Sequence, residues 1–222
     1  MHMLIALKCI ALCLITITGC QTMANAAGHA TGDTRTWEVH RVQVDDKVVE
    51  FKIPPNESKE FPGFAIPQKL DLHGGDVFSE TLTGPSILNR YWDYRASRFV
   101  AVDGTLHAYI GIHRSTKELI DEQAIKNAIE EGSKLFAIHV AKGRQGLLDP
   151  PVRYNKMTIG GKEWWQVDYR ISGRYYITSL DGYHYLKASV NAGQMSDSAW
   201  RADSQAAANA ILHSIRIVPA LR

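Results

Sequence analysis

The sequence predicts an α+β domain in which an antiparallel β-sheet, with a C-terminal four-stranded meander, is flanked by two main helices. Glycine-containing turns separate short runs that alternate between apolar and polar residues, which is typical of antiparallel strands. Two longer segments repeat apolar residues every three or four positions, as amphipathic helices do. The 222 residues suffice for one ordinary domain with a sizeable core, and no internal repeat or low-complexity tract supports a second.

The first strands flank a short turn. Residues 36–44 and 47–53 alternate in hydropathy on either side of Asp45-Asp46, which predicts an opening hairpin. The segment 54–88 is rich in proline and glycine and follows neither period, so we expect an irregular excursion with one short strand. Long irregular segments in compact domains are often functional, which makes this one a candidate contact surface.

Later strands are separated by two-residue turns that glycine favours because it accepts a positive φ. These turns are Asp103-Gly104, Gly160-Gly161, Ser172-Gly173 and Asp181-Gly182. The expected strands cover residues 97–102, 105–113, 152–159, 162–171, 174–180 and 183–190. We expect the last four of them to form the meander.

Two helices are predicted from capping signals and apolar spacing. Ser115 to Glu118 forms a capping box that opens the first helix, and Gly143 ends it. The second helix is expected from about Ser196, with Pro219 stopping the chain. Its buried residues should be Trp200, Ala207, Ala208, Ile211 and Ile215.

The N-terminus carries a leader. Residues 4–18 are apolar apart from Lys8, Thr16 and Thr18, a run too short and too interrupted for a permanent membrane span, so it is interpreted as a signal peptide. The sequence Ile17-Thr18-Gly19-Cys20 that follows resembles the lipobox of bacterial lipoproteins. The resemblance implies cleavage before Cys20 and lipid attachment to its sulfur. An ordinary secreted protein, cut near Ala24-Asn25-Ala26, is the alternative.

The lipobox divides the chain into three parts: a signal peptide over 1–19, a flexible tether over 20–35 and a single domain over 36–222. In such lipoproteins an Asp after the cysteine typically retains the protein in the inner membrane, and this chain has Gln21 there. The resemblance therefore implies an outer-membrane lipoprotein that faces the periplasm of a Gram-negative envelope. Its membrane contact would be the N-terminal lipid.

Cysteine content and charge exclude several classes of function. Cys9 and Cys13 leave with the leader and Cys20 is used for lipid, so the folded domain has no thiol for a disulfide, a nucleophile or a metal. Removal of Lys8 leaves 24 basic residues against 23 acidic residues. A nucleic-acid partner is disfavoured, because phosphate binding needs a basic excess.

The last third of the chain has a second resemblance. It is carried by residues 164–169, Tyr175-Tyr176, residues 182–186, Trp200 and residues 211–215. This pattern looks like the PsbP superfamily, which includes the Mog proteins and many small bacterial lipoproteins. The resemblance implies an antiparallel sheet flanked by helices and no shared catalytic apparatus.

A search for reaction centres gives no catalytic residues, no cofactor and no metal site. Nucleophile elbows, HExxH motifs and phosphate-binding glycine loops are absent from the sequence. His107 and His113 fall on one face of a strand but lie about 20 Å apart, which is too far to share a metal. Structural roles are expected for both histidines.

One candidate binding patch follows from strand alternation. In residues 162–171 every second side chain is apolar and should face the core, and the side chains between them should point away from it. The same reasoning applies to residues 183–190. The resulting aromatic and cationic patch would contain Trp164, Arg170, Tyr183, Tyr185 and Lys187. The alternative is that a helix covers this face and the aromatic residues belong to the core.

The sequence therefore favours a lipid-anchored periplasmic binding or accessory protein without catalytic activity, acting through contact with an envelope protein. One alternative is an immunity lipoprotein that neutralises a toxin delivered to the periplasm. Another is an envelope enzyme or carrier acting on glycan or lipid, with 54–88 as its lid. The last alternative requires a deep pocket.

Overall fold

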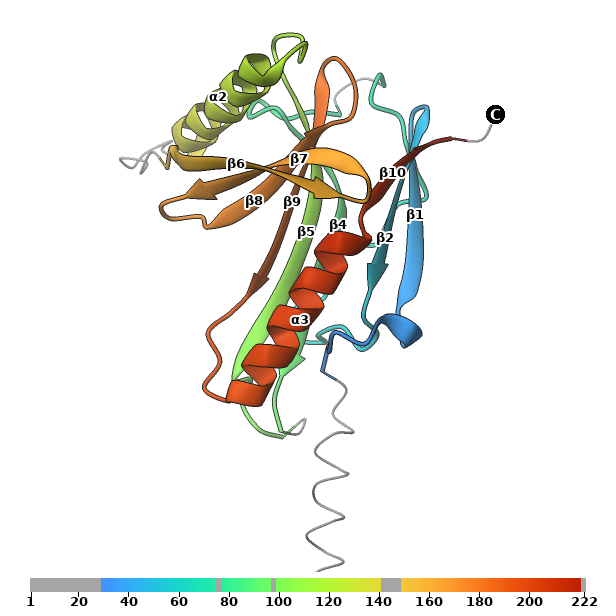
Figure 1. The fold of residues 1–222 in the computed structure, drawn as a ribbon, viewed down its shortest axis with the longest axis vertical. Helices are drawn as coiled ribbons and strands as arrows, with labels where there is room; N and C mark the ends of the chain where they lie inside the picture. The colour runs from blue at the N-terminus through green and yellow to red at the C-terminus, as the bar shows by residue number, and fades with distance from the viewer. Residues whose placement is uncertain (1–28, 75–76, 97–98, 141–148, 221–222) are drawn as a thin grey trace, which may run out of the picture.

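The computed structural model describes residues 29–74, 77–96, 99–140 and 149–220 (Figure 1). These residues form an α+β fold with two long helices and two β-sheets, which confirms the predicted class. The smaller sheet has the strand order β10-β2-β1-β3, and the larger has the order β4-β5-β9-β8-β7-β6. The leader, Cys20 and the tether up to residue 28 lie outside the described residues.

The smaller sheet contains the opening hairpin, as predicted. β1 (Glu38–Val44) and β2 (Lys47–Ile53) pair antiparallel, and Asp45 has a φ of 50° in the turn between them. Two short strands extend the hairpin: β3 (Lys69–Leu70) pairs parallel to β1, and β10 (Arg216–Pro219) pairs antiparallel to β2. β10 was not predicted, because Pro219 suggested a stop, whereas proline is tolerated in an edge strand.

The larger sheet contains the remaining strands, and all its neighbouring pairs are antiparallel. Four of its strands, which come last before the second long helix, are neighbours in chain order. The strands are β4 (Thr83–Tyr94), β5 (Gly104–Arg114), β6 (Pro151–Ile159), β7 (Lys162–Tyr169), β8 (Arg174–Ser179) and β9 (His184–Ala192).

The strand predicted over 97–102 is wrong. The described residues 99–102 contain no strand, and Phe99 and Val100 are 84% and 51% exposed, so this apolar run is not buried. The partner of β5 is β4, which begins inside the segment that we expected to be irregular. β4 forms a strand because it buries large side chains, among them Trp92. The indole N–H of Trp92 donates to the carbonyl of Pro54 at 3.1 Å.

The first long helix begins later than predicted. α2 spans Glu122–Val140, and Asp121 caps it by accepting a hydrogen bond from the backbone N–H of Ala124 at 2.7 Å. Ser115 does not cap a helix, because its hydroxyl accepts from the N–H of Lys117 in a local turn. The predicted end at Gly143 lies outside the described residues.

The second long helix agrees with the prediction in type and place. α3 spans Ser198–Ser214, and the carboxylate of Asp197 accepts hydrogen bonds from the N–H groups of Ala199 and Trp200. Ala207, Ala208, Ile211 and Ile215 are buried as expected, and Trp200 is partly buried.

Both faces of the larger sheet are covered. One face packs against α3 and the smaller sheet, and its core includes Trp164 and Leu186. The opposite face packs against α2, and its core includes Trp165, Tyr185 and Ile129. Figure 1 shows α3 lying along β5 and α2 lying at the end of the molecule near the β6–β9 strands.

The folded part of the chain begins before residue 36. The hydroxyl of Tyr94 donates to the carbonyl of Ala30 at 2.6 Å, and Ala30 is only 3% exposed. The His29 ring lies 3.2 Å from a carboxylate oxygen of Asp203 in α3. A 3₁₀ turn, η1, follows at Thr34–Thr36. His29 and Ala30, which fall in the segment predicted as the tether, therefore pack against the domain, whereas Asp33, Thr34 and Arg35 are exposed.

Candidate functional site

The five residues of the predicted patch do not form one exposed surface. Trp164 is fully buried and Tyr185 is 4% exposed, whereas Tyr183 is 48% exposed and Arg170 lies exposed beyond the end of β7. Lys187 is half-buried.

The error lies in how the strands were aligned. Trp165 pairs with Ile177, and Ile177 pairs with Lys187, so Trp165 and Lys187 share a face. Trp164 must then point to the opposite face, because successive side chains alternate. Trp164 belongs to the core beneath α3, and Tyr185 belongs to the core beneath α2.

The structure instead places Tyr185 and Lys187 in a cavity of about 480 Å³ between α2 and the larger sheet. Alternate residues of β5 and β9 form much of its floor, with contributions from β7 and β8, and α2 covers part of it. The residues on the sheet are Thr83, His107, Tyr109, His113, Tyr169, Tyr175, Ile177, Tyr185, Lys187, Ser189 and Asn191. We call this space the α2 cavity.

Lys187 supplies a partly buried amine to the α2 cavity. Its Nζ lies 4.0 Å from the ring centroid of Tyr175 and 5.4 Å from that of Tyr169, so the amine rests on aromatic faces. Burial lowers the pKa of Lys187 to about 8, against the opposing effect of the Asp149 carboxylate. Among the described residues no carboxylate forms an ion pair with this amine.

His113 supplies a second buried polar group on the same face. It is 9% exposed, and its ring stacks on Tyr185 with 5.4 Å between centroids. Within the described part of the chain its Nε2 has no hydrogen-bond partner. Burial, and then the charge of Lys187, lower the pKa of His113 to about 3. The ring is therefore neutral at physiological pH.

A glycine makes room for a tyrosine in this cluster. Gly111 lies directly opposite Lys187 in the β5–β9 pairing. A side chain at Gly111 would collide with the hydroxyl of Tyr109, so glycine lets that phenol lie over the strand. Burial raises the pKa of Tyr109, which therefore stays protonated and can donate a hydrogen bond.

α2 lies close above the sheet. The hydroxyl of Tyr169 is 3.3 Å from the Ser133 hydroxyl on α2, and a Cβ at Gly132 would lie 3.2 Å from the Tyr185 hydroxyl. Burial raises the pKa of Tyr169 to about 12 and also raises that of Tyr185. Both phenols are therefore neutral hydrogen-bonding groups.

Among the described residues that line the cavity, Asp149 is the acidic one. Its carboxylate accepts hydrogen bonds from the backbone N–H groups of Ile171 at 3.0 Å and Ser172 at 2.7 Å. Burial raises its pKa, but the hydrogen bonds from Ser172 and the neighbouring backbone outweigh that effect, and the pKa lies below its ordinary value. Asp149 is therefore a charged residue whose oxygens already have partners.

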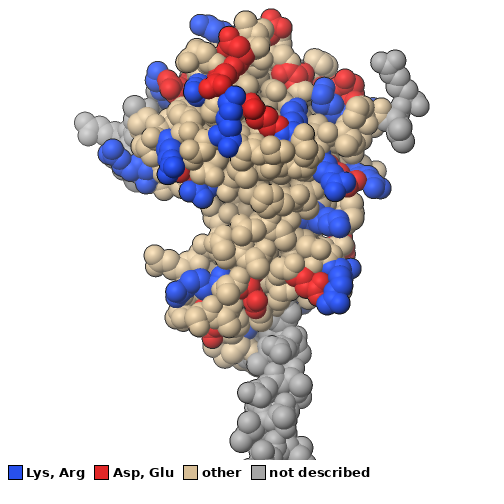
Figure 2. Space-filling view, in the orientation of Figure 1, with Lys and Arg blue, Asp and Glu red and all other residues tan. Residues whose placement is uncertain are grey.

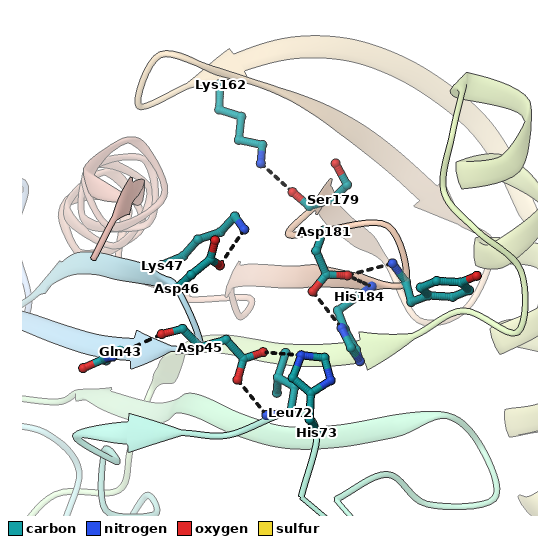
Figure 3. Close-up of polar contacts among 11 residues, drawn as sticks. Gln43, Asp45, Asp46, Lys47, Leu72, His73, Lys162, Ser179, Asp181 and His184 are labelled. Carbon is teal, nitrogen blue, oxygen red and sulfur yellow. Dashed lines mark hydrogen bonds and ion pairs between the residues drawn. The ribbon is translucent and has the colours of Figure 1, made fainter. Parts of the chain in front are cut away.

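A second polar cluster lies where two turns of different sheets approach each other (Figure 3). Asp181 accepts hydrogen bonds from the ring Nδ1 and the backbone N–H of His184, both at 2.8 Å. Asp45 accepts from the N–H of Leu72 at 3.0 Å and lies 3.6 Å from the ring of His73. Because Asp181 fixes its own turn and Asp45 holds the β1–β2 turn against the segment after β3, we assign this cluster a structural role.

A second hollow, of about 660 Å³, lies between α2 and residues 115–121, but its described lining is mostly charged and polar, with Lys117, Glu118, Asp121, Glu130, Glu131 and Lys134 among the residues. Figure 2 shows basic and acidic side chains interspersed over the visible face, with an uncharged band across its middle. Groups of three or more residues suited to a metal ion are absent from the described residues. None of the helices that these residues form is long and apolar enough to cross a membrane.

Neither a protein-family model nor a curated protein matches the chain.

Sequence reasoning named two residues of the cavity, Tyr185 and Lys187, and missed the others. A signal was present in β5, where Leu106, Ala108, Ile110 and Ile112 alternate with histidine, tyrosine and glycine. Both faces of this strand are covered, and one of them carries aromatic and polar side chains instead of aliphatic ones. Such a face is typical of the wall of a ligand cavity.

We predict that Lys187→Met raises the free energy of unfolding by about 2 kcal/mol at pH 7, because it removes a partly desolvated amine that has no carboxylate partner among the described residues. The gain should shrink as pH rises from about 8 to 10.5. Over that range Lys187 is protonated in the unfolded wild type and deprotonated in the folded one, so the stability of the wild type increases with pH. Urea unfolding at several pH values measures this difference.

Lys156→Met is the matched control. Lys156 lies on β6, is partly exposed, and pairs with Glu122 and Glu163. The hydrogen bonds that its ammonium donates to these carboxylates raise its pKa, so its removal should produce no such gain in stability. A constant difference between Lys187→Met and wild type from pH 7 to 10.5 would contradict the assignment.

Proposed function

We propose that this chain is a lipid-anchored envelope protein that binds a small molecule in the α2 cavity. The observation that carries the proposal is the cavity itself, at about 480 Å³. Small-molecule sites are commonly concave, span roughly 300–1,000 Å³ and combine apolar walls with a few polar groups. The α2 cavity has this composition.

The walls suit a ligand with an apolar body. Tyr169, Tyr175 and Ile177 come from the sheet, and Ile129 faces them from α2. Aromatic rings provide large, flat contact areas at low cost in conformational entropy. The polar atoms of Lys187 and its neighbours would then orient the ligand rather than supply most of its binding free energy.

The proposal keeps a binding role without a reaction, as the sequence favoured, but moves the contact from a surface patch to a cavity. It is closest to the carrier alternative, which requires a deep pocket. We also propose that the chain shares the PsbP/Mog-like architecture, on the support of its antiparallel sheets, two long helices and strand order.

The position of the first described residues supports the tether. His29 and Ala30 contact α3 and the end of β4, at the end of the molecule opposite α2 in Figure 1. Cys20 precedes His29 by nine residues, which can span at most about 30 Å. A lipid on Cys20 would hold this end near an outer membrane and leave the α2 end facing the periplasm.

Contact with an envelope protein is a second candidate, favoured by exposed aromatic residues in the irregular segment before β4. Phe61 is 49% exposed and Phe64 is 71% exposed. Exposed aromatic residues near one another are typical of protein-binding surfaces. A partner could bind there while the α2 cavity holds its ligand.

We predict that the neutral fluorophore N-phenyl-1-naphthylamine binds the full chain carrying Cys20→Ala, which removes the acylation site. In the same background, Gly132→Leu should weaken binding at least about tenfold, because its side chain enters the cavity toward Tyr185. Fluorescence titration measures both constants.

Lys134→Leu is the control, since it adds the same side chain at an exposed position of α2. It should leave fluorophore binding unchanged, with circular dichroism showing that all three proteins are folded. Equal binding by the wild-type background and by folded Gly132→Leu would overturn the proposed small-molecule site.

We predict that cells fed radiolabelled palmitate incorporate the label into the wild-type chain and not into Cys20→Ala. The reason is that acylation requires the sulfur of that cysteine. Gel autoradiography after purification reads the result, and immunoblotting checks that both proteins are present. Label on both proteins, or on neither, would refute the lipid tether.

A further inference from the structure

We propose that the α2 cavity selects an amphipathic organic anion, with a single carboxylate that contacts Lys187 and His113 and a flat apolar body that lies against the tyrosines. This inference rests on the proposed small-molecule site and names the chemical class of its ligand. Four features of the described residues support it.

The first feature is a cation without an anion. The Lys187 amine contacts the rings of Tyr175 and Tyr169, and no described carboxylate pairs with it. Aromatic faces stabilise an ammonium less well than a hydrogen-bonded counterion does when both are removed from water. A ligand carboxylate would supply that counterion.

The second feature is the unpartnered ring nitrogen of His113. His113 pairs with Tyr185 across β5 and β9, and Gly111 pairs with Lys187, so His113 and Lys187 are diagonal neighbours on one face. The Nε2 atom is buried without a partner. A neutral imidazole can donate an N–H to one carboxylate oxygen while the lysine amine donates to the other.

The third feature is the arrangement of the competing acid. Asp149 could neutralise Lys187 from within the chain, but its oxygens accept hydrogen bonds from the backbone N–H groups of Ile171 and Ser172. It forms no ion pair with Lys187. Its negative charge, next to a single cation, disfavours a doubly charged ligand such as a phosphate monoester.

The fourth feature is space for a hydrophobic body. The cavity of about 480 Å³ far exceeds what a carboxylate group needs. Tyr169 and Tyr175 meet edge to face, with ring centroids 5.4 Å apart, and present aromatic surface to the cavity. An aromatic or alicyclic acid fits this environment better than a small hydrophilic acid does.

The test compares two probes that differ in charge and hardly in shape: naphthalene-2-carboxylate and naphthalene-2-carboxamide. Calorimetric titration at pH 7 of the full chain carrying Cys20→Ala should show the acid binding at least about tenfold tighter than the amide. Lys187→Met should abolish this preference by weakening the acid about 10- to 100-fold while leaving the amide unchanged.

Two further variants separate the cavity groups from general charge effects. His113→Phe keeps an aromatic ring against Tyr185 and should weaken the acid several-fold without affecting the amide. Lys156→Met removes a lysine outside the cavity and should leave the preference intact.

The preference should also depend on pH. Above pH 8 Lys187 loses its proton, so the affinity for the acid should fall about tenfold by pH 9, and Lys187→Met should show no such fall. The other titratable groups around the amine do not change charge over this range: His113 and the tyrosines stay neutral and Asp149 stays charged.

Equal binding of acid and amide, or a preference that survives in Lys187→Met, would overturn the inference. A third result would also overturn it: the Cys20→Ala chain binds neither naphthalene probe but does bind N-phenyl-1-naphthylamine, and Gly132→Leu weakens that binding. In each of these cases the proposed small-molecule site would stand. If Gly132→Leu leaves the neutral fluorophore unaffected, the small-molecule site itself fails.

Discussion

The larger β-sheet must bury two faces, and the described chain has one long helix for each. α3 and the smaller sheet cover one face closely, and Trp164 and Leu186 pack there with no exposure to solvent. α2 covers the other face over β7 and β8, where Trp165 and Ile177 meet Ile129. Toward β5 and β9 that face instead presents tyrosines, histidines and Lys187, and the α2 cavity occupies the space.

This arrangement places the Lys187 amine in a partly desolvated environment that disfavours its charged form. Burial lowers the pKa of Lys187, and the ring of Tyr175 and the nearby charge of Asp149 offset part of that penalty without an ion pair. Met or Leu at this position would favour stability alone. The lysine therefore lowers the stability of the fold, and it lies inside a cavity beside the unpartnered nitrogen of His113. Such a combination is typical of a binding site.

The sequence predicted much of the fold because the opening hairpin, the last strands and α3 combine turn residues, alternation and caps that agree with one another. It failed where an apolar run is not buried, at Phe99 and Val100, and where Asp121 outcompetes the capping box at Ser115. It nominated Tyr185 and Lys187 but paired them with Trp164. Alternation within one strand shows which residues share a face, whereas only the pairing of Trp165, Ile177 and Lys187 shows which faces of different strands coincide.

The central claim is that Lys187 holds a partly desolvated amine in the α2 cavity, without a carboxylate partner among the described residues. NMR titration of the full chain with isotope-labelled lysine side chains tests this claim most directly, with Lys187→Met used to assign the signal. The claim predicts a midpoint near pH 8 for Lys187. A midpoint near 10.4, which is the ordinary value for a solvated lysine, would contradict it.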